Sequence, residues 1–201
     1  MKTLLVAAAA ALLSTVAAAA ATVGQPAPAF TVQDTSGKPV SLADFKGKTV
    51  VLEWVNPGCP YVQKHYNSAN MQGTQKDAAA KGVVWLAVNS TTAEHSDYKA
   101  PAAMAQWMQQ QKAAANATLM DADGQVGRAY GARTTPHMYI VDAKGTLVYA
   151  GAIDNKPSAN PADVTTATNH VKVALGELQA GKAISLPSTR PYGCSVKYPA
   201  S

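Results

Sequence analysis

The chain has 201 residues and a formal net charge of +5, from 17 Lys and Arg against 12 Asp and Glu. The basic residues are spread singly along the chain and form no stripe with interleaved aromatic residues, which argues against nucleic acid as a partner. The length fits a single domain whose core needs no disulfide to be stable.

The N-terminus follows the three-part plan of a secretory signal peptide. Lys2 precedes an apolar run over residues 3–16, and small residues continue to Ala21. This run is too short to span a bilayer comfortably, so we predict a signal peptide over residues 1–21 that is cleaved. The mature domain, residues 22–201, is then periplasmic or secreted and has no membrane span.

The first half of the domain predicts a hairpin and a βαβ unit. A turn sequence, Asp34-Thr-Ser-Gly37, separates two short strands at residues 31–33 and 39–42. A continuous β-branched and apolar run at residues 49–56 is typical of a strand covered on both faces. A helix is predicted over residues 59–80, and a second buried strand over residues 83–88.

The second half predicts two more helical regions and a clear hairpin. A helix over residues 97–115 is followed by a short strand at residues 118–120 and a short helix at residues 126–130. Strands at residues 137–141 and 146–150 flank a turn, and a final helix spans residues 163–180 before a tail that starts at about residue 182. This order predicts an α/β fold: a central mixed sheet with helices on both faces and an N-terminal β-hairpin.

Cys59 is the first candidate for chemistry. It follows a predicted buried strand and stands at the N-cap of a helix whose first residue is Pro60, a position that suits proline. Free amide hydrogens and the positive end of the helix dipole favour a thiolate there, so we expect Cys59 to be a nucleophile. The alternative is a structural cysteine, which would more naturally lie inside an apolar strand. Lys64 and His65 lie one to two turns along this helix, where His65 could face Cys59, but a half-exposed position on the surface is favoured.

Two further residues stand where they could assist a thiol. Glu53 lies inside the strand before Cys59; buried, it would have a raised pKa and could hold a proton, and the alternative is an edge carboxylate in solvent. Pro136 opens a strand, and a cis bond after Thr135 would present the Thr135 carbonyl and amide to the thiol or to an extended peptide. Frequency alone favours trans, because about one X-Pro bond in twenty is cis.

These features carry a family resemblance. Residues 41–48, 54–62, 121–131 and 134–142 resemble, in motif and in order, the thioredoxin superfamily, and within it the exported redoxins of peroxiredoxin-like (AhpC/TSA-type) and TlpA-like type. The resemblance covers most of residues 25–180. It implies a thioredoxin-like three-layer sandwich and an antioxidant or thiol-disulfide oxidoreductase activity that needs no cofactor and no metal.

The resemblance also assigns roles by position. Cys59 matches the first cysteine of the CxxC motif, Val62 stands in the place of the second, Glu53 matches the buried acid and Pro136 the cis-proline. Four residues are expected to contact substrate: Thr135, Pro136, Pro60 and Trp54. Without a second cysteine in the motif, Cys59 cannot close a disulfide there.

Cys194, in the turn-rich tail, is the remaining thiol. Our hypothesis is that the tail folds back and that Cys194 resolves a mixed disulfide or sulfenic acid on Cys59. The expected partners are protein or small-molecule thiols and disulfides, with peroxide as a further candidate. The second hypothesis is a non-catalytic binding module that holds a metal ion or a peptide beside Pro136, with Cys59 and Cys194 in a structural disulfide.

Overall fold

The computed structural model describes residues 20–200. The predicted signal peptide lies outside these residues apart from its last two positions. Among the described residues, none of the helices has the length and apolar character needed to cross a membrane.

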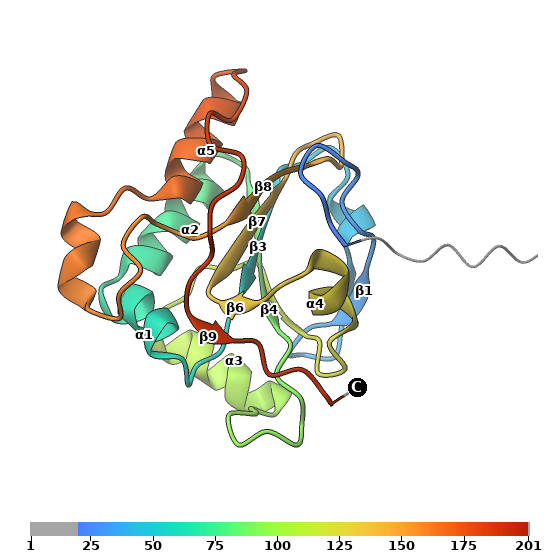
Figure 1. Ribbon diagram of the computed structural model, residues 1–201. Coiled ribbons are helices and arrows are strands. Elements are labelled where there is room, and N and C mark those ends of the chain that lie inside the picture. Colours follow the sequence, from blue (N-terminus) through green and yellow to red (C-terminus); the bar gives the residue numbers. More distant parts are fainter. Residues whose placement is uncertain (1–19, 201) are drawn as a thin grey trace, which may run out of the picture.

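A five-stranded mixed sheet forms the centre of the molecule (Figure 1). Its strands follow the order β5-β4-β3-β7-β8, with β3 parallel to β4, β4 parallel to β5, and β7 antiparallel to both β3 and β8. Because β3 has a neighbour on each side and layers on both faces, all of its residues are buried, as the continuous apolar run predicts. The strands are β3 (Val50–Trp54), β4 (Val84–Asn89), β5 (Ala117–Met120), β7 (His137–Val141) and β8 (Leu147–Gly151).

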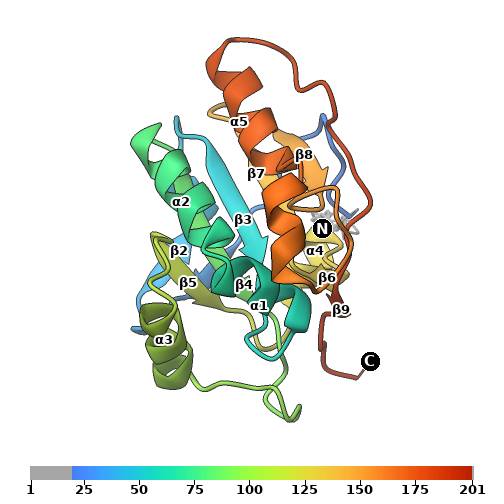
Figure 2. The same cartoon turned by 90° about the vertical axis from the view of Figure 1, so that its left-hand side faces the viewer.

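Two layers cover this sheet (Figures 1 and 2). On one face pack α1 (Pro60–Asn67), α2 (Asn70–Ala80), α3 (Pro101–Gln110) and α5 (His170–Gln179). On the other lie α4 (Gln125–Tyr130), the 3-10 helix η1 (Leu42–Phe45) and the hairpin β1 (Thr31–Gln33) and β2 (Pro39–Ser41). The predicted α/β three-layer sandwich with an N-terminal hairpin is confirmed.

The single helix predicted over residues 59–80 is wrong. It is two helices, α1 and α2, because Ala69 takes a left-handed conformation with φ 58°. Such a backbone is costly for an L-residue, and neither Gly nor Pro marks the break. Polar side-chain contacts accompany the bend. Asn70 Nδ2 lies 2.8 Å from His65 Nδ1, and Gln72 Nε2 donates to the Tyr66 carbonyl at 2.9 Å.

The other long helices are shorter than predicted. The helix expected over residues 97–115 starts only at Pro101, since the residue before a proline is kept extended, and Ala100 has ψ 155°. The helix expected over residues 163–180 is divided into a 3-10 turn, η2 (Pro161–Thr166), and α5. Asn169 restarts the chain as an N-cap, with its side-chain oxygen accepting from the Lys172 amide at 3.0 Å.

The C-terminal tail returns to the sheet. Its strand β9 (Cys194–Ser195) pairs antiparallel with β6 (Thr134–Thr135), just before β7. Figure 1 shows this red segment passing α1 and lying beside β6. The tail therefore reaches the helix end at which Cys59 stands.

Candidate active site

Cys59 stands at the N-cap of α1, directly after the turn that leaves β3. Pro60 is the first helical residue, and both Gly58 and Pro60 are exposed while Cys59 itself is only 1% exposed. The thiol therefore lies immediately below the surface. Its Sγ makes no capping hydrogen bond within the described chain, so the expected contact with the helix amides is not made in this arrangement.

The Cys59 thiol instead points at the Thr135–Pro136 peptide, which is cis. Its Sγ donates to the Thr135 carbonyl oxygen at 3.0 Å. Thr135 is buried, and its hydroxyl makes no hydrogen bond among the described residues. The structure thus brings Cys59, Pro60, Thr135 and Pro136 together at one edge of the molecule.

Cys194 completes this edge. In the β6–β9 pair it stands directly opposite Thr135. Burial, followed by the proximity of Cys59, raises the pKa of the Cys194 thiol to about 12. Both cysteines are free thiols. Two cysteines far apart in the sequence therefore both lie at the buried Thr135.

Glu53 is fully buried in β3, so the alternative of a solvent-facing edge carboxylate is wrong. Its Oε1 accepts from the Tyr66 hydroxyl at 2.9 Å, and its Oε2 accepts from Trp85 Nε1 at 2.8 Å and Gln75 Nε2 at 3.1 Å. Burial raises the pKa of Glu53 to about 7, although these three donors oppose the shift. Glu53 lies on the sheet face that α1 and α2 cover, the face of Cys59.

Trp54 is not part of this surface. Successive side chains of a strand point to opposite faces, so Trp54 points away from Glu53 and from Cys59. Its indole is fully buried in the core beneath the N-terminal hairpin, where Nε1 donates to the Ser90 hydroxyl at 3.0 Å. The expectation that Trp54 contacts substrate is therefore corrected: it is a core residue.

A second group of polar residues lies beside the thiols, and the sequence indicated only its helix members as candidates. Lys64 and His65 of α1 and Asp154 are buried, and the tail hydroxyl of Tyr192 reaches all three. His65 is thus not the half-exposed surface residue that the sequence favours. The available signal in the sequence was a polar side chain at helical positions that face the sheet. This signal did not indicate which residues these side chains contact.

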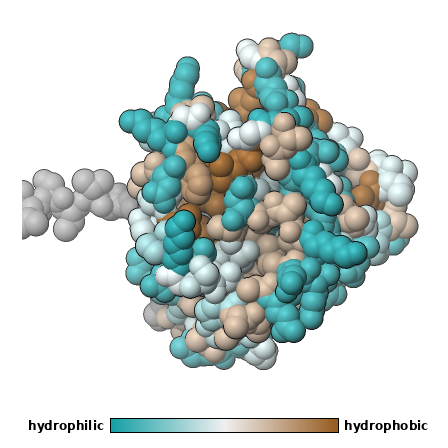
Figure 3. Space-filling view, turned by 180° about the vertical axis from the view of Figure 1, so that it is seen from behind, coloured by the Kyte–Doolittle hydropathy of each residue, from teal (hydrophilic) through white to brown (hydrophobic). Residues whose placement is uncertain are grey.

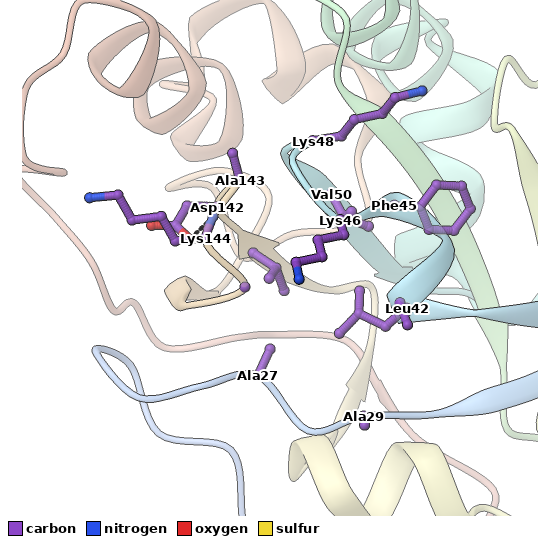
Figure 4. A pocket seen from close by; sticks show the side chains of 13 residues that line it. Ala27, Ala29, Leu42, Phe45, Lys46, Lys48, Val50, Asp142, Ala143 and Lys144 are labelled. Carbon is purple, nitrogen blue, oxygen red and sulfur yellow. Dashed lines mark hydrogen bonds between the residues drawn. The ribbon is translucent and has the colours of Figure 1, made fainter.

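One pocket lies beside this site. Its volume is about 540 Å³, and its lining includes Thr134, Asp154, Tyr192 and Gly193. A pocket of about 330 Å³ lies at the opposite end of β3 from Cys59 and is lined by apolar side chains such as Leu42 and Phe45, with Lys46, Lys48 and Lys144 around it (Figure 4). From behind, hydrophobic residues gather in a hollow between hydrophilic ones (Figure 3). Among residues 20–200 no three His, Cys, Asp or Glu side chains lie close enough together to hold a metal ion.

Comparison with known proteins identifies the family. The AhpC/TSA family model matches residues 23–150. The chain belongs to the AhpC/TSA family. As an AhpC/TSA-family member it is a thioredoxin-superfamily redoxin, which confirms the resemblance seen in its motifs.

Two curated relatives and one solved structure are similar to this AhpC/TSA-family chain. Thiol-disulfide oxidoreductase ResA of Bacillus thuringiensis subsp. konkukian (strain 97-27) is 26% identical over 133 residues, which is 63% of this chain and 67% of ResA. Thioredoxin-like protein YneN of Bacillus subtilis (strain 168) is 30% identical over 149 residues, 70% of this chain and 79% of YneN. An uncharacterized conserved protein from Geobacillus kaustophilus shares the fold with a TM-score of 0.76 and 26% identity, over 90% of this chain and 94% of that one.

Proposed function

We propose that this protein is a thiol-disulfide oxidoreductase that uses Cys59 as nucleophile and Cys194 as resolving thiol. The observation that carries the proposal is that both cysteines meet at Thr135: the Cys59 thiol donates to its carbonyl, and Cys194 pairs with it in the β6–β9 pair, in a chain whose CxxC position holds Val62. Similarity to ResA, a thiol-disulfide oxidoreductase by name, supports the same class of reaction.

The reaction follows from the order of the two thiols. The Cys59 thiolate attacks one sulfur of a substrate disulfide, the S–S bond breaks, and the first substrate thiolate leaves and takes a proton. Cys194, after losing its proton to solvent or to the leaving thiolate, attacks Cys59 Sγ and releases the second substrate thiol. The substrate gains two electrons, the protein holds a Cys59–Cys194 disulfide, and an external dithiol restores the two thiols. Run in reverse, the same steps oxidise a dithiol.

Four neighbours have parts in this proposal. Thr135 and the cis Pro136 shape the edge at which a substrate approaches Cys59, and Pro60 is an exposed apolar contact beside it. Glu53 holds a proton near neutral pH on the same face of the sheet. The substrates are protein or small-molecule thiols and disulfides, and the working compartment is the periplasm or the exterior, which rests on the sequence of residues 1–21.

The test is turnover in single-cysteine variants. With insulin as substrate and a dithiol as donor, we expect Cys59→Ser and Cys194→Ser each to lower turnover at least about 100-fold. Cys194→Ser should also accumulate a mixed disulfide on Cys59, visible by mass spectrometry, because its resolving thiol is gone. Ser195→Ala, a change at the exposed neighbour in β9, is the matched control and should turn over like the wild type. Hydrogen peroxide in place of insulin tests a peroxidase instead.

The rival is a permanent structural bridge in a non-catalytic module. Titration of the Cys59–Cys194 pair against glutathione measures its reduction potential. A potential below about −300 mV, together with no turnover in the wild type, would establish the bridge and end the oxidoreductase proposal.

A further inference from the structure

We propose that Tyr192 is a positioning residue that latches the C-terminal tail over Cys59. In this arrangement Cys59 meets a substrate only after the tail lifts, and the latch returns Cys194 to the mixed disulfide. The inference rests on the proposed function, and it adds a residue outside the cysteine pair that sets how quickly each thiol reacts.

The first support is a buried polar cluster that receives the Tyr192 hydroxyl. The hydroxyl donates to the Asp154 carboxylate and lies 3.1 Å from His65 Nε2 and 3.4 Å from Lys64 Nζ. Lys64 Nζ in turn lies 3.5 Å from Asp154 Oδ2 and donates to the Lys156 carbonyl at 2.7 Å. The side chains of Lys64, His65 and Asp154 are fully buried. A lysine and an aspartate that are buried away from solvent need hydrogen-bond partners within the protein, and Tyr192 of the tail is one of these partners.

In this cluster the Tyr192 hydroxyl keeps its proton. Burial lowers the pKa of His65 to about 4, with Asp154 opposing the shift and Lys64 adding to it, so the imidazole is neutral at neutral pH. Burial, followed by the bond to Asp154, raises the pKa of the Tyr192 hydroxyl well above its usual value. Tyr192 therefore stays a hydrogen-bond donor over the whole physiological range.

The second support is that the same helix, α1, both begins at Cys59 and binds Tyr192 of the tail. Cys59 caps α1, and Lys64 and His65 lie one to two turns farther along the same helix. Tyr192 stands two residues before Cys194, and its ring packs edge-on against Tyr61 of α1, with centroids 5.9 Å apart. Anchoring Tyr192 thus places Cys194 at the N-terminal end of α1.

The third support is the close contact between the tail after Tyr192 and the Thr135 carbonyl beside Cys59. Gly193 has φ 137°, and a Cβ there would collide with the Thr135 carbonyl, the acceptor for the Cys59 thiol. Beyond Cys194, the Val196 amide donates to the Arg133 carbonyl at 3.0 Å. The tail is therefore pressed onto the carbonyl beside Cys59 and held on both sides of Cys194. This explains why a thiol between two exposed residues is itself only 1% exposed.

The first measurement is alkylation of the reduced, full-length protein by iodoacetamide, with each cysteine followed by peptide mass mapping. Losing a hydrogen bond to a buried carboxylate should raise the population with the tail lifted, so Cys59 in Tyr192→Phe should react about five- to tenfold faster than in the wild type. Tyr61→Phe is the matched control: it is a Tyr→Phe change in the adjacent ring, whose hydroxyl makes no hydrogen bond within the described chain, and its rate should equal the wild type's.

The second measurement follows the attack of Cys194 on the mixed disulfide, which Tyr192→Phe should slow, whereas it speeds alkylation of Cys59. Excess glutathione disulfide oxidises Cys59 to a mixed disulfide with release of one glutathione, and Cys194 then displaces the second. In Tyr192→Phe this second release should be about five- to tenfold slower, because the tail spends less time docked. General loosening of the fold would speed the first reaction without this opposite change, so the pair of changes marks a latch. A thermal unfolding midpoint close to that of Tyr61→Phe confirms that the variant is folded.

Gly193→Ala provides a second variant, since it lifts the tail from Thr135 without touching the polar cluster. It should show the same two changes. If it does and Tyr192→Phe behaves like the wild type in both reactions, the tail gates Cys59 but Tyr192 is not the latch, and the inference is overturned. If no variant and not even the wild type releases the second glutathione, resolution by Cys194 fails, while the alkylation rates still decide the role of Tyr192.

Discussion

At the scale of single residues, the face of the sheet to which a side chain points decides its surroundings. Glu53 and Trp54 are neighbours in β3, and both are fully buried. Glu53 faces α1 and α2 and meets three donors, whereas Trp54 faces the other layer and meets Ser90. Alternation along one strand thus separates a titratable group from a packing group, one residue apart.

Glu53 also makes stability depend on pH. Its pKa is raised from 4.5 to about 7 in the folded protein, so the folded state holds the proton more tightly than the unfolded state between these values. The wild type should therefore lose of the order of 3 kcal/mol of unfolding free energy as pH rises from 4.5 through 7, relative to Glu53→Gln. Urea unfolding at several pH values measures the difference between the two proteins.

The same pair of proteins tests the catalytic part of Glu53. If Glu53 only supports the core, the variant will alter the pH dependence of stability and leave the pH profile of turnover in place. If Glu53 transfers a proton in the reaction, the turnover of the wild type will change with pH near 7, and this change will be absent in Glu53→Gln. An unchanged unfolding free energy at every pH would contradict the raised pKa itself.

At the scale of elements, the break between α1 and α2 lets both helices reach the same buried carboxyl. Tyr66 of α1 and Gln75 of α2 both donate to Glu53. The break is made by Ala69, an exposed residue in the left-handed conformation. In an uninterrupted helix, Tyr66 and Gln75 would point in nearly opposite directions, and both could not reach Glu53.

A glycine at this break should stabilise the protein. Ala69→Gly removes the steric cost of the left-handed backbone, and we expect a gain of about 0.5 to 1 kcal/mol after the greater chain entropy of glycine is counted. Ala79→Gly, at an exposed position inside α2, is the matched control and should destabilise by about 0.5 to 1 kcal/mol. Equal losses in both variants would show that Ala69 bears no strain.

At the scale of the whole molecule, the tail joins the last part of the chain to the first helix after the central strand. Its contacts run along β8, over α1 and past β6. A Cys59–Cys194 disulfide would close a loop that contains most of the domain. Forming this disulfide would therefore couple oxidation state to global stability.

The oxidised protein should be the more stable one. On the chain-entropy model a loop of this size adds up to about 5 kcal/mol to the free energy of unfolding. Urea unfolding of oxidised and reduced wild type measures this gain, and Cys59→Ser should show no difference between oxidising and reducing conditions. A gain near zero in the wild type would mean that bond formation distorts the folded tail by as much as it constrains the unfolded chain.

Local patterns in the sequence determined the strands of the central sheet, the two hairpins, the position of Cys59 at a helix start and the place of Glu53 in a central strand. Each follows from short-range chemistry: alternation, turn residues, capping and proline. Only the tertiary structure decided the break at Ala69, the burial of His65 with Lys64 and Asp154, and the pairing of Cys194 with Thr135. These depend on contacts between segments distant in the chain, whose free energy exceeds local propensity and leaves no periodic mark in either segment.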